Sequence, residues 1–201
     1  TTRLMGAGLP IRTPTVDRGE LLGGELYLSA WVQGIPGGNV GTELCVTDGT
    51  VAGTRLAIDL VPGVASSAPR FHRAWQGSLY FVVGLTLYRS DGTPAGTAVV
   101  PDASADQASF GADDFGANFP DLPNAPFFPT AGALIFPSRT ASTFGGEVEL
   151  WRTGPAGSEL LIDIAPPTTI GSEPRELVRV GDLLFFSATP AHLFPRRVFV
   201  Y

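Results

Sequence analysis

The chain has 201 residues, of which 44% are hydrophobic and only 16% are charged, so it is expected to be globular rather than disordered. Its formal net charge of −6 disfavours nucleic-acid binding, because no run of basic residues offsets it locally. Every basic residue is Arg, which excludes Schiff-base chemistry on a lysine and a phosphate loop that needs one.

A single cysteine, Cys45, excludes an intrachain disulfide and a cysteine-based zinc site. No apolar run approaches the roughly 20 residues of a spanning helix, so we expect no membrane-spanning segment. The first ten residues, TTRLMGAGLP, lack the charged-then-apolar pattern of a signal peptide. We therefore expect any export signal to be absent from this chain.

The first predicted unit, approximately residues 20–76, contains GELYLSA from Gly24 and then ELCVTDGTVAGT at 43–54. In this second stretch Asp48 can accept backbone N–H bonds two residues on, and Gly49 can supply the positive φ of a tight hairpin. A phosphate loop would need a lysine and a following helix. A calcium loop would need several oxygen ligands along one segment, but this turn offers a single carboxylate. A structural turn is therefore predicted.

The second unit, approximately 77–131, repeats both elements as GSLYFVV from Gly77 and LTLYRSDGTPAGT at 85–97. Asp91 and Gly92 are expected to form the same turn. Strand-length pieces such as SLYFVV, LTLYRS and GTAVV are separated by turn chemistry.

An insertion loop at 98–131 makes the second unit 12 residues longer than the matching part of the first. Long loops on a rigid scaffold often carry recognition, and exposed Phe would suit a protein contact. The binding candidates in this loop are Asp113, Asp114, Phe115 and Phe119. The alternatives are a loop packed by its own aromatic side chains, and a metal site.

The third unit, approximately 132–180, begins with GALIFPS from Gly132 and continues with VELWRTGPAGS at 148–158. This copy of the turn is two residues shorter and has lost the Asp-Gly pair. A fourth, partial unit at 181–201 begins with GDLLFFSA from Gly181.

The four G-x-L segments follow one another at steps of 53, 55 and 49 residues, a period near 50. Gly53, Gly96 and Gly157 close the three turns. An acidic residue follows six positions later in every copy, which suggests a structural role; these residues are Asp59, Asp102 and Asp163. Four short strands in about 50 residues, copied several times, are typical of propeller blades. We predict an all-β, β-propeller-like array of four-stranded antiparallel blades, about 3.5 to 4 units in one repeat domain (1–201), with almost no helix.

These units resemble the bacterial ELWxxDGT-type repeat, in which ELW-x-x-DGT-x-AGT precedes a DI-PG segment and then G-x-L-[YF]-F-S-A. The matching stretches are ELCVTDGTVAGTRLAIDLVPG, LYRSDGTPAGT, ELWRTGPAGSELLIDIAP and the four G-x-L segments, which cover most of residues 20–188. Cys45 replaces the Trp of the motif in the first copy. The resemblance implies surface or exported proteins of propeller-like repeats, and it implies no catalytic residues.

Two arrangements of about three and a half units remain open. The two ends could complete one blade together in a four-bladed ring, or the chain could be part of a larger assembly whose partners cover the end faces. Low charge favours the assembly.

Other candidate residues fit a structural role better than a catalytic one. His72, beside Arg70, Arg73 and Trp75, could bind an anionic sugar, but strand alternation would put His72 and Trp75 on opposite faces. His192 has no nearby catalytic partner in the sequence. Since no nucleophile elbow or HExxH motif occurs, we predict that the protein is not an enzyme and needs no cofactor.

The leading hypothesis is an extracytoplasmic binding or scaffold protein that engages a protein or glycan partner through its loops. The alternative is a structural subunit of a bacterial surface assembly or filament. A glycoside-active enzyme fits least, because Asp113 and Asp114 are adjacent and cannot easily face each other across a cleft.

Overall fold

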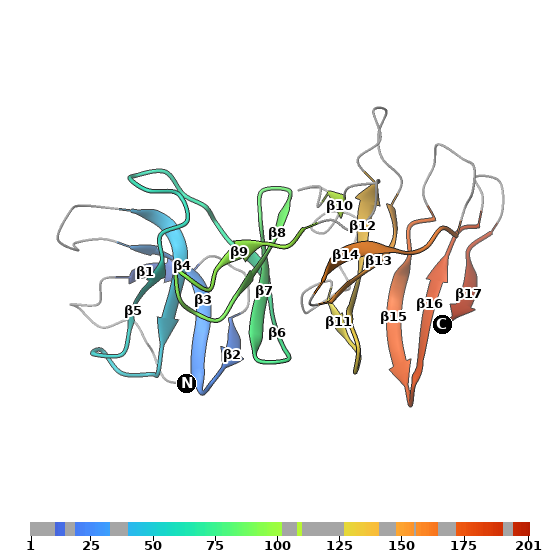
Figure 1. Cartoon of the computed structure of the whole chain (residues 1–201), viewed down its shortest axis with the longest axis horizontal. Coiled ribbons are helices and arrows are strands. Elements are labelled where there is room, and N and C mark those ends of the chain that lie inside the picture. The colour runs from blue at the N-terminus through green and yellow to red at the C-terminus, as the bar shows by residue number, and fades with distance from the viewer. Residues whose placement is uncertain are drawn as a thin grey trace. The chain divides into compact units, whose positions relative to one another are not determined.

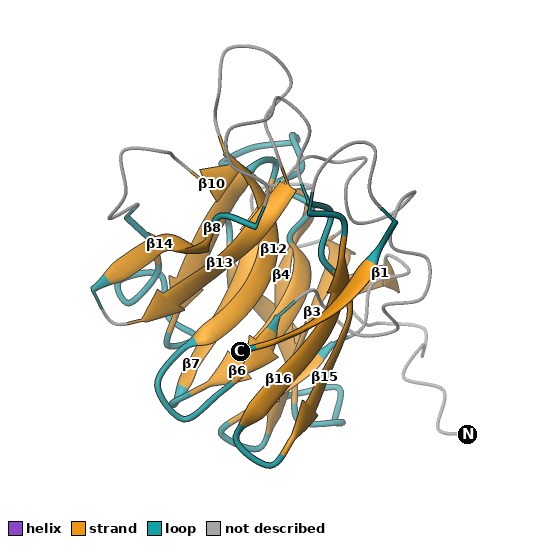
Figure 2. Ribbon diagram, turned by 90° about the vertical axis from the view of Figure 1, so that its right-hand side faces the viewer, coloured by secondary structure: helices purple, strands orange, loops and turns teal. Residues whose placement is uncertain are grey.

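The computed structural model describes residues 11–14, 19–32, 40–101, 108–109, 127–140, 148–154, 156–164, 172–190 and 195–201. Within these ranges the chain forms only β-strands, turns and irregular segments, with no helix (Figure 2). The strands pair antiparallel in four separate sheets, so the predicted all-β antiparallel class is confirmed for the described part. None of the described residues belongs to a helix of the length and apolar character that crossing a bilayer requires.

The chain divides into two compact units, Thr1–Val99 and Val100–Tyr201, and each unit contains two sheets (Figure 1). Each unit is described by itself below.

The first unit contains a five-stranded and a four-stranded sheet. In the first sheet the order is β1-β3-β4-β5, with β2 also paired to β3. Its strands are β1 (Ile11–Pro14), β2 (Glu20–Leu22), β3 (Glu25–Val32), β4 (Gly41–Thr47) and β5 (Arg55–Ile58). The second sheet has the order β6-β7-β8-β9. Its strands are β6 (Arg70–Trp75), β7 (Ser78–Val83), β8 (Thr86–Ser90) and β9 (Ala98–Val99).

The second unit contains a five-stranded and a three-stranded sheet. In the third sheet the order is β10-β12-β13-β14, with β11 also paired to β12. Its strands are β10 (Ala108–Ser109), β11 (Phe128–Pro129), β12 (Leu134–Thr140), β13 (Val148–Gly154) and β14 (Gly157–Ile162). The fourth sheet has the order β15-β16-β17. Its strands are β15 (Arg175–Val180), β16 (Leu183–Ala188) and β17 (Arg197–Val200).

Leu44, Leu87 and Leu150, the leucines of the three turn-bearing stretches, occupy the same place in the ladders of their sheets. In each case the partner lies three residues after the leucine of the G-x-L segment. The pairs are Leu44 with Ser29, Leu87 with Val82, and Leu150 with Pro137. All three leucines are buried. The sequence recurrence therefore corresponds to a recurrence of strand register.

The core of each unit lies between its two sheets. In the first unit, Tyr27 and Leu44 of the first sheet pack with Leu79 and Phe81 of the second. In the second unit the cluster joins both sheets as well; its buried members are Ile135, Leu150, Ile164, Leu177, Leu184, Phe186 and Ala188. Strands such as β7 are buried along almost their whole length, as a continuous apolar run predicts.

The second and fourth sheets do not begin at the glycines of their G-x-L segments. β6, which precedes Gly77, pairs with β7, and β15, which precedes Gly181, pairs with β16. Each of these sheets therefore begins one strand before its glycine. The turn between β6 and β7 is Gln76-Gly77, and the turn between β15 and β16 is Gly181-Asp182. Because the two glycines take different places in their turns, the residue of β16 that is equivalent to Leu79 is Leu184.

The expectation of strict alternation along β6 is wrong. His72 and Trp75 are both buried, although they are three residues apart. The register of β6 against β7 shifts between Arg70 and Arg73, and Phe71 within that shift has φ 58°. This irregularity turns His72 inward, where its ring stacks on Phe81 with centroids 6.1 Å apart.

Candidate functional site

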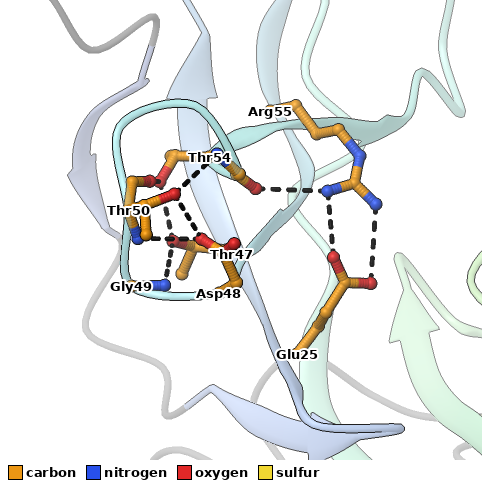
Figure 3. Close-up of polar contacts among 8 residues, drawn as sticks. Glu25, Thr47, Asp48, Gly49, Thr50, Thr54 and Arg55 are labelled. Atoms are coloured by element: carbon orange, nitrogen blue, oxygen red, sulfur yellow. Dashed lines mark hydrogen bonds and ion pairs between the residues drawn. The ribbon is translucent and has the colours of Figure 1, made fainter.

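The turn between β4 and β5 is held by a closed network of side-chain hydrogen bonds (Figure 3). Asp48 Oδ1 accepts from the backbone N–H of Thr50 at 2.8 Å and from its hydroxyl at 2.7 Å. The Thr50 Oγ1 atom accepts from Gly53 N at 2.9 Å. Thr54 donates its hydroxyl to Thr50 O at 2.6 Å. Gly49 has φ 92°, the left-handed conformation that a tight turn demands.

The first turn needs a glycine at position 53 for a steric reason. A Cβ atom added at Gly53 would lie 2.1 Å from Asp48 Oδ1. The hydrogen bonds from Thr50 lower the pKa of Asp48, so this carboxylate is ionised at neutral pH. Beside the turn, Arg55 Nη1 contacts Glu25 Oε1 at 3.0 Å in an exposed ion pair, which contributes little to stability.

The turn between β8 and β9 has the same bonds. Asp91 Oδ1 accepts from Thr93 N at 2.9 Å and from the Thr93 hydroxyl at 2.7 Å, and these bonds lower the pKa of Asp91. A Cβ at Gly96 would lie 2.1 Å from Asp91. Unlike the first turn, this one packs on the neighbouring sheet: a Cβ at Gly92 would lie 2.2 Å from the Tyr27 hydroxyl.

The third turn, between β13 and β14, is built differently. Gly154 pairs directly with Gly157, and the Thr153 hydroxyl donates to Gly157 O at 3.2 Å. Gly157 has φ 130°, and a Cβ there would lie 2.4 Å from Pro101 O. Here the glycine permits close backbone approach, so its role differs from that of Gly53 and Gly96.

Buried glutamates hold the linker between the two sheets in each unit. Glu43 Oε1 accepts from Ser67 N at 2.7 Å, and its Oε2 accepts from Leu60 N at 3.0 Å and from the Ser67 hydroxyl. Glu43 is fully buried, and burial raises its pKa. The linker of 59–69 is therefore tied to β4 at both ends.

Glu149 makes the same bonds in the second unit. Its Oε1 accepts from Ser172 N at 2.9 Å, and its Oε2 accepts from Ile164 N at 3.1 Å and from the Ser172 hydroxyl at 2.7 Å. Burial raises the pKa of Glu149 as well. We call each set of three bonds a glutamate clamp.

Sequence analysis did not find these clamps, although a signal for them exists. Both glutamates precede the recurring leucine, in ELC and ELW, and both linkers end in S-x-P-R, as SAPR at 67–70 and SEPR at 172–175. Ala68 and Glu173, at the x position, share a positive φ of 44° and 46°. The second stretch has Thr86 at the glutamate position, so a search for residues common to all three copies misses the pattern.

A cavity of about 420 Å³ opens between the third and fourth sheets, inside the second unit. Its apolar lining includes Ile135, Leu161 and Leu184. Its polar lining includes Thr130, Arg152, Thr153, Glu159, Asp182 and Tyr201. Arg152 Nε donates to Glu159 Oε1 at 2.6 Å across the β13–β14 ladder, and Tyr201 is half exposed. We call this cavity the second-unit pocket.

The matching place in the first unit is filled. Tyr27 in β3 and Ile135 in β12 occupy equivalent positions in their sheets. Tyr27 pairs with Val46, which precedes Thr47, and Ile135 pairs with Arg152, which precedes Thr153. The Tyr27 ring reaches the turn at 91–96, as the close approach to Gly92 shows. In the second unit Tyr201 pairs with Leu184, as Ser90 pairs with Leu79, so Tyr201 is the counterpart of the residue that precedes the turn at 91–96.

The four loop candidates, Asp113, Asp114, Phe115 and Phe119, lie outside the described residues, as does His192. Over the ranges that the structure covers, no group of three or more His, Cys, Asp or Glu side chains could hold a metal ion. Cys45 is buried, and burial raises the pKa of its thiol to about 12, so it is not a nucleophile at neutral pH.

No protein-family model matches the chain, and no curated protein matches its sequence.

Proposed function

We propose that this chain is an extracytoplasmic binding protein of propeller-like, ELWxxDGT-type repeats that engages a protein or glycan partner. The observation that carries this proposal is the equivalent strand register of Leu44, Leu87 and Leu150, which agrees with the repeats of the exported proteins that the sequence resembles.

The surrounding structure supports a role as a rigid scaffold. The glutamate clamps tie linkers to strands, and the hydrogen bonds of Asp48 and Asp91 fix two turns. The recurrence of strand register and turn geometry supports the repeat architecture. The resemblance to exported repeat proteins supports the extracytoplasmic placement, which protease accessibility of the protein on intact cells would test.

The binding function is tested by screening the purified chain on an array of neutral and acidic glycans and against surface proteins of the producing cell. We expect saturable binding of at least one partner, verified by calorimetry, with no turnover. Turnover of a glycan that one carboxylate substitution abolishes would contradict the proposal, and so would the absence of saturable binding to either partner class.

A second candidate function, a structural subunit of a surface assembly, is favoured by strand β17. Among the described strands β17 pairs with β16 alone. Its Val198 is 75% exposed and Val200 is 57% exposed, next to half-exposed Tyr201. An open apolar edge strand can pair with another chain.

Size-exclusion chromatography with light scattering tests the assembly. If β17 joins subunits, the wild type elutes above its monomer mass, and a Val198→Lys/Val200→Lys variant elutes as a monomer. The control is Val64→Lys, which adds a charge at an exposed linker residue. A wild type that is monomeric at high concentration would exclude this function.

A further inference from the structure

We propose that the Asp48-Gly49 and Asp91-Gly92 bonds are sites of spontaneous isoaspartate formation, which the hydroxyl groups of their own turns hold inactive. In this reaction the backbone nitrogen of the glycine loses its proton and attacks Cγ of the aspartic acid, and the carboxyl OH leaves as water. Water then opens the cyclic succinimide at its α-carbonyl, so the backbone continues through Cγ. The reaction needs no oxidant and no other reagent.

Sequence and exposure both make these two bonds susceptible. Glycine has no side chain to hinder the attack of its nitrogen, and its backbone is free to adopt unusual conformations. Asp48 and Asp91 are both exposed to water. Burial therefore does not protect them, and protection has to come from the bonds that the turns themselves make.

The first protective contact holds the carboxylate. Asp48 Oδ1 accepts two hydrogen bonds from Thr50, and Asp91 Oδ1 accepts the same two from Thr93, at distances of 2.7 to 2.9 Å. Attack by the glycine nitrogen turns the carboxylate into a neutral imide carbonyl, so these charge-assisted bonds would be lost. They also lower the pKa of both aspartates, so the protonated acid, whose OH is the leaving group, is scarce at neutral pH.

The second protective contact holds the N–H proton that the reaction must remove. Gly49 N donates to Thr47 Oγ1 at 3.0 Å (Figure 3). Because the Thr54 hydroxyl donates to Thr50 O, the Thr47 hydroxyl is the donor in its 2.7 Å contact with Thr54. Thr47 and Thr54 are buried. Loss of the Gly49 proton would therefore leave a buried hydroxyl oxygen without its donor, which is unfavourable.

The turn at 90–97 repeats this chain of hydroxyl groups with a serine in the first place. Gly92 N donates to Ser90 Oγ at 2.9 Å, and the Ser90 and Thr97 hydroxyl oxygens lie 2.7 Å apart. The Thr97 hydroxyl donates to Thr93 O at 2.6 Å. The third turn has no Asp-Gly pair, and it also has no residue that matches Thr50 and Thr93. The protecting hydroxyl therefore occurs together with the pair that needs it.

The test is incubation of the 201-residue chain near neutral pH, followed by proteolysis, chromatography and mass spectrometry. Chromatography separates isoaspartate peptides from aspartate peptides of equal mass, and the succinimide is lighter by one water. The peptides TDGTVAGT and SDGTPAGT, residues 47–54 and 90–97, give the unprotected rates under the same conditions. We expect both bonds to isomerise at least about tenfold more slowly in the folded chain, as loss of one hydrogen bond to a charged group predicts.

The two turns of one molecule serve as controls for each other. Thr50→Val removes the hydroxyl that binds Asp48, so it should accelerate isomerisation at Asp48 about tenfold and leave the rate at Asp91 unchanged. Thr93→Val should have the converse effect. Thr50→Ser keeps a hydroxyl at this place, so its rate at Asp48 should stay near that of the wild type.

Isomerisation of the folded chain at the rate of the peptides would overturn the proposal. So would a Thr50→Val variant that has a native circular dichroism spectrum and either an unchanged rate at Asp48 or equal acceleration at both sites, because protection would then not come from the local hydroxyl. If Thr50→Val does not fold, Ser90→Ala replaces it. This variant removes the acceptor of the Gly92 N–H and keeps both bonds to Asp91, so faster isomerisation at Asp91 alone is expected, and an unchanged rate there would overturn the role of the glycine contact.

Discussion

Gly53 and Gly96 lie where any larger side chain would collide with the carboxylate that holds the turn. The collision involves Asp48 in one turn and Asp91 in the other, at the same 2.1 Å. Neither glycine is needed for a positive φ, which is the task of Gly49 and Gly92. The two glycines of each Asp-Gly-Thr turn therefore have different physical roles.

Replacement of Gly53 by Ala is expected to displace the Asp48 carboxylate and to lower the free energy of unfolding by about 1 kcal/mol, a typical effect of one substitution. Urea unfolding measures the change, and NMR titration should show the lowered pKa of Asp48 moving back up. Gly132→Ala is the control, because a Cβ there meets nothing within 4 Å. An unchanged Asp48 pKa would contradict this account of Gly53.

The buried Glu149 is expected to make stability depend on pH. Burial raises its folded-state pKa above the ordinary value of 4.5, because the folded state disfavours the ionised form. Its contribution to stability is therefore fully present below pH 4.5 and is lost as the pH rises through the folded-state pKa.

The measurement is urea unfolding at a series of pH values in a Trp31→Phe/Trp75→Phe background, in which Trp151 is the only tryptophan and its fluorescence reports unfolding. We expect the free energy of unfolding to fall from pH 4.5 towards neutrality, and to fall less in Glu149→Gln. The exposed Glu159→Gln controls for the loss of one charge. Equal pH profiles for Glu149→Gln and the wild type would show that Glu149 does not cause the dependence.

At the scale of elements, the linkers between sheets are fixed by a few long-range bonds. Each glutamate clamp joins a strand to a serine 23 or 24 residues further along the chain. The backbone around that serine has positive φ at Ala68 and Glu173. Such a conformation costs energy for residues other than glycine, and it persists because the surrounding bonds determine it.

Loss of one clamp hydroxyl should destabilise the unit that contains it. Ser67→Ala and Ser172→Ala each remove a hydrogen bond to a buried carboxylate, so we expect losses of about 1–2 kcal/mol. Denaturation of each variant in urea gives the loss. Val64→Ala, at a residue of the same linker that is 83% exposed, should cost about 0.5 kcal/mol or less. Equal losses for Val64→Ala and Ser67→Ala would argue against the clamp.

At the scale of the whole molecule, the division at Val99 and Val100 separates two pairs of sheets, each with its own core clusters. Trp31 and Trp75 belong to the first unit, and Trp151 is fully buried in the second. These residues can report the two units separately.

The two units are expected to unfold in two transitions, because each has its own core. A Trp31→Phe/Trp75→Phe variant follows the second unit through Trp151, and Trp31→Phe/Trp151→Phe follows the first through Trp75. The urea midpoints of the two variants should differ while circular dichroism of the wild type spans both. Coincident transitions from all three measurements would show that the chain unfolds as one cooperative body.

Local chemistry made the strands and turns predictable. The Asp-Gly-Thr turns depend on residues within a few positions of one another, and the strands are continuous apolar runs between turn residues, so the all-β class and the hairpins of β4 and β8 could be read from the chain. Propeller closure, partner and location remain predictions. The loop candidates at 113–119 lie outside the described residues.

The amino-acid sequence by itself determined where strands end and which turns carry an aspartate network, because those features depend on short-range bonds and backbone preferences. Only the tertiary structure decided that β6 belongs with β7, that a bulge turns His72 inward, and that Glu43 and Glu149 clamp the linkers. The clamps depend on contacts between residues far apart in the chain, which strand periodicity does not indicate. The pairing of β6 with β7 is a local hairpin, but its register shift between Arg70 and Arg73 departs from the alternating pattern of a regular strand.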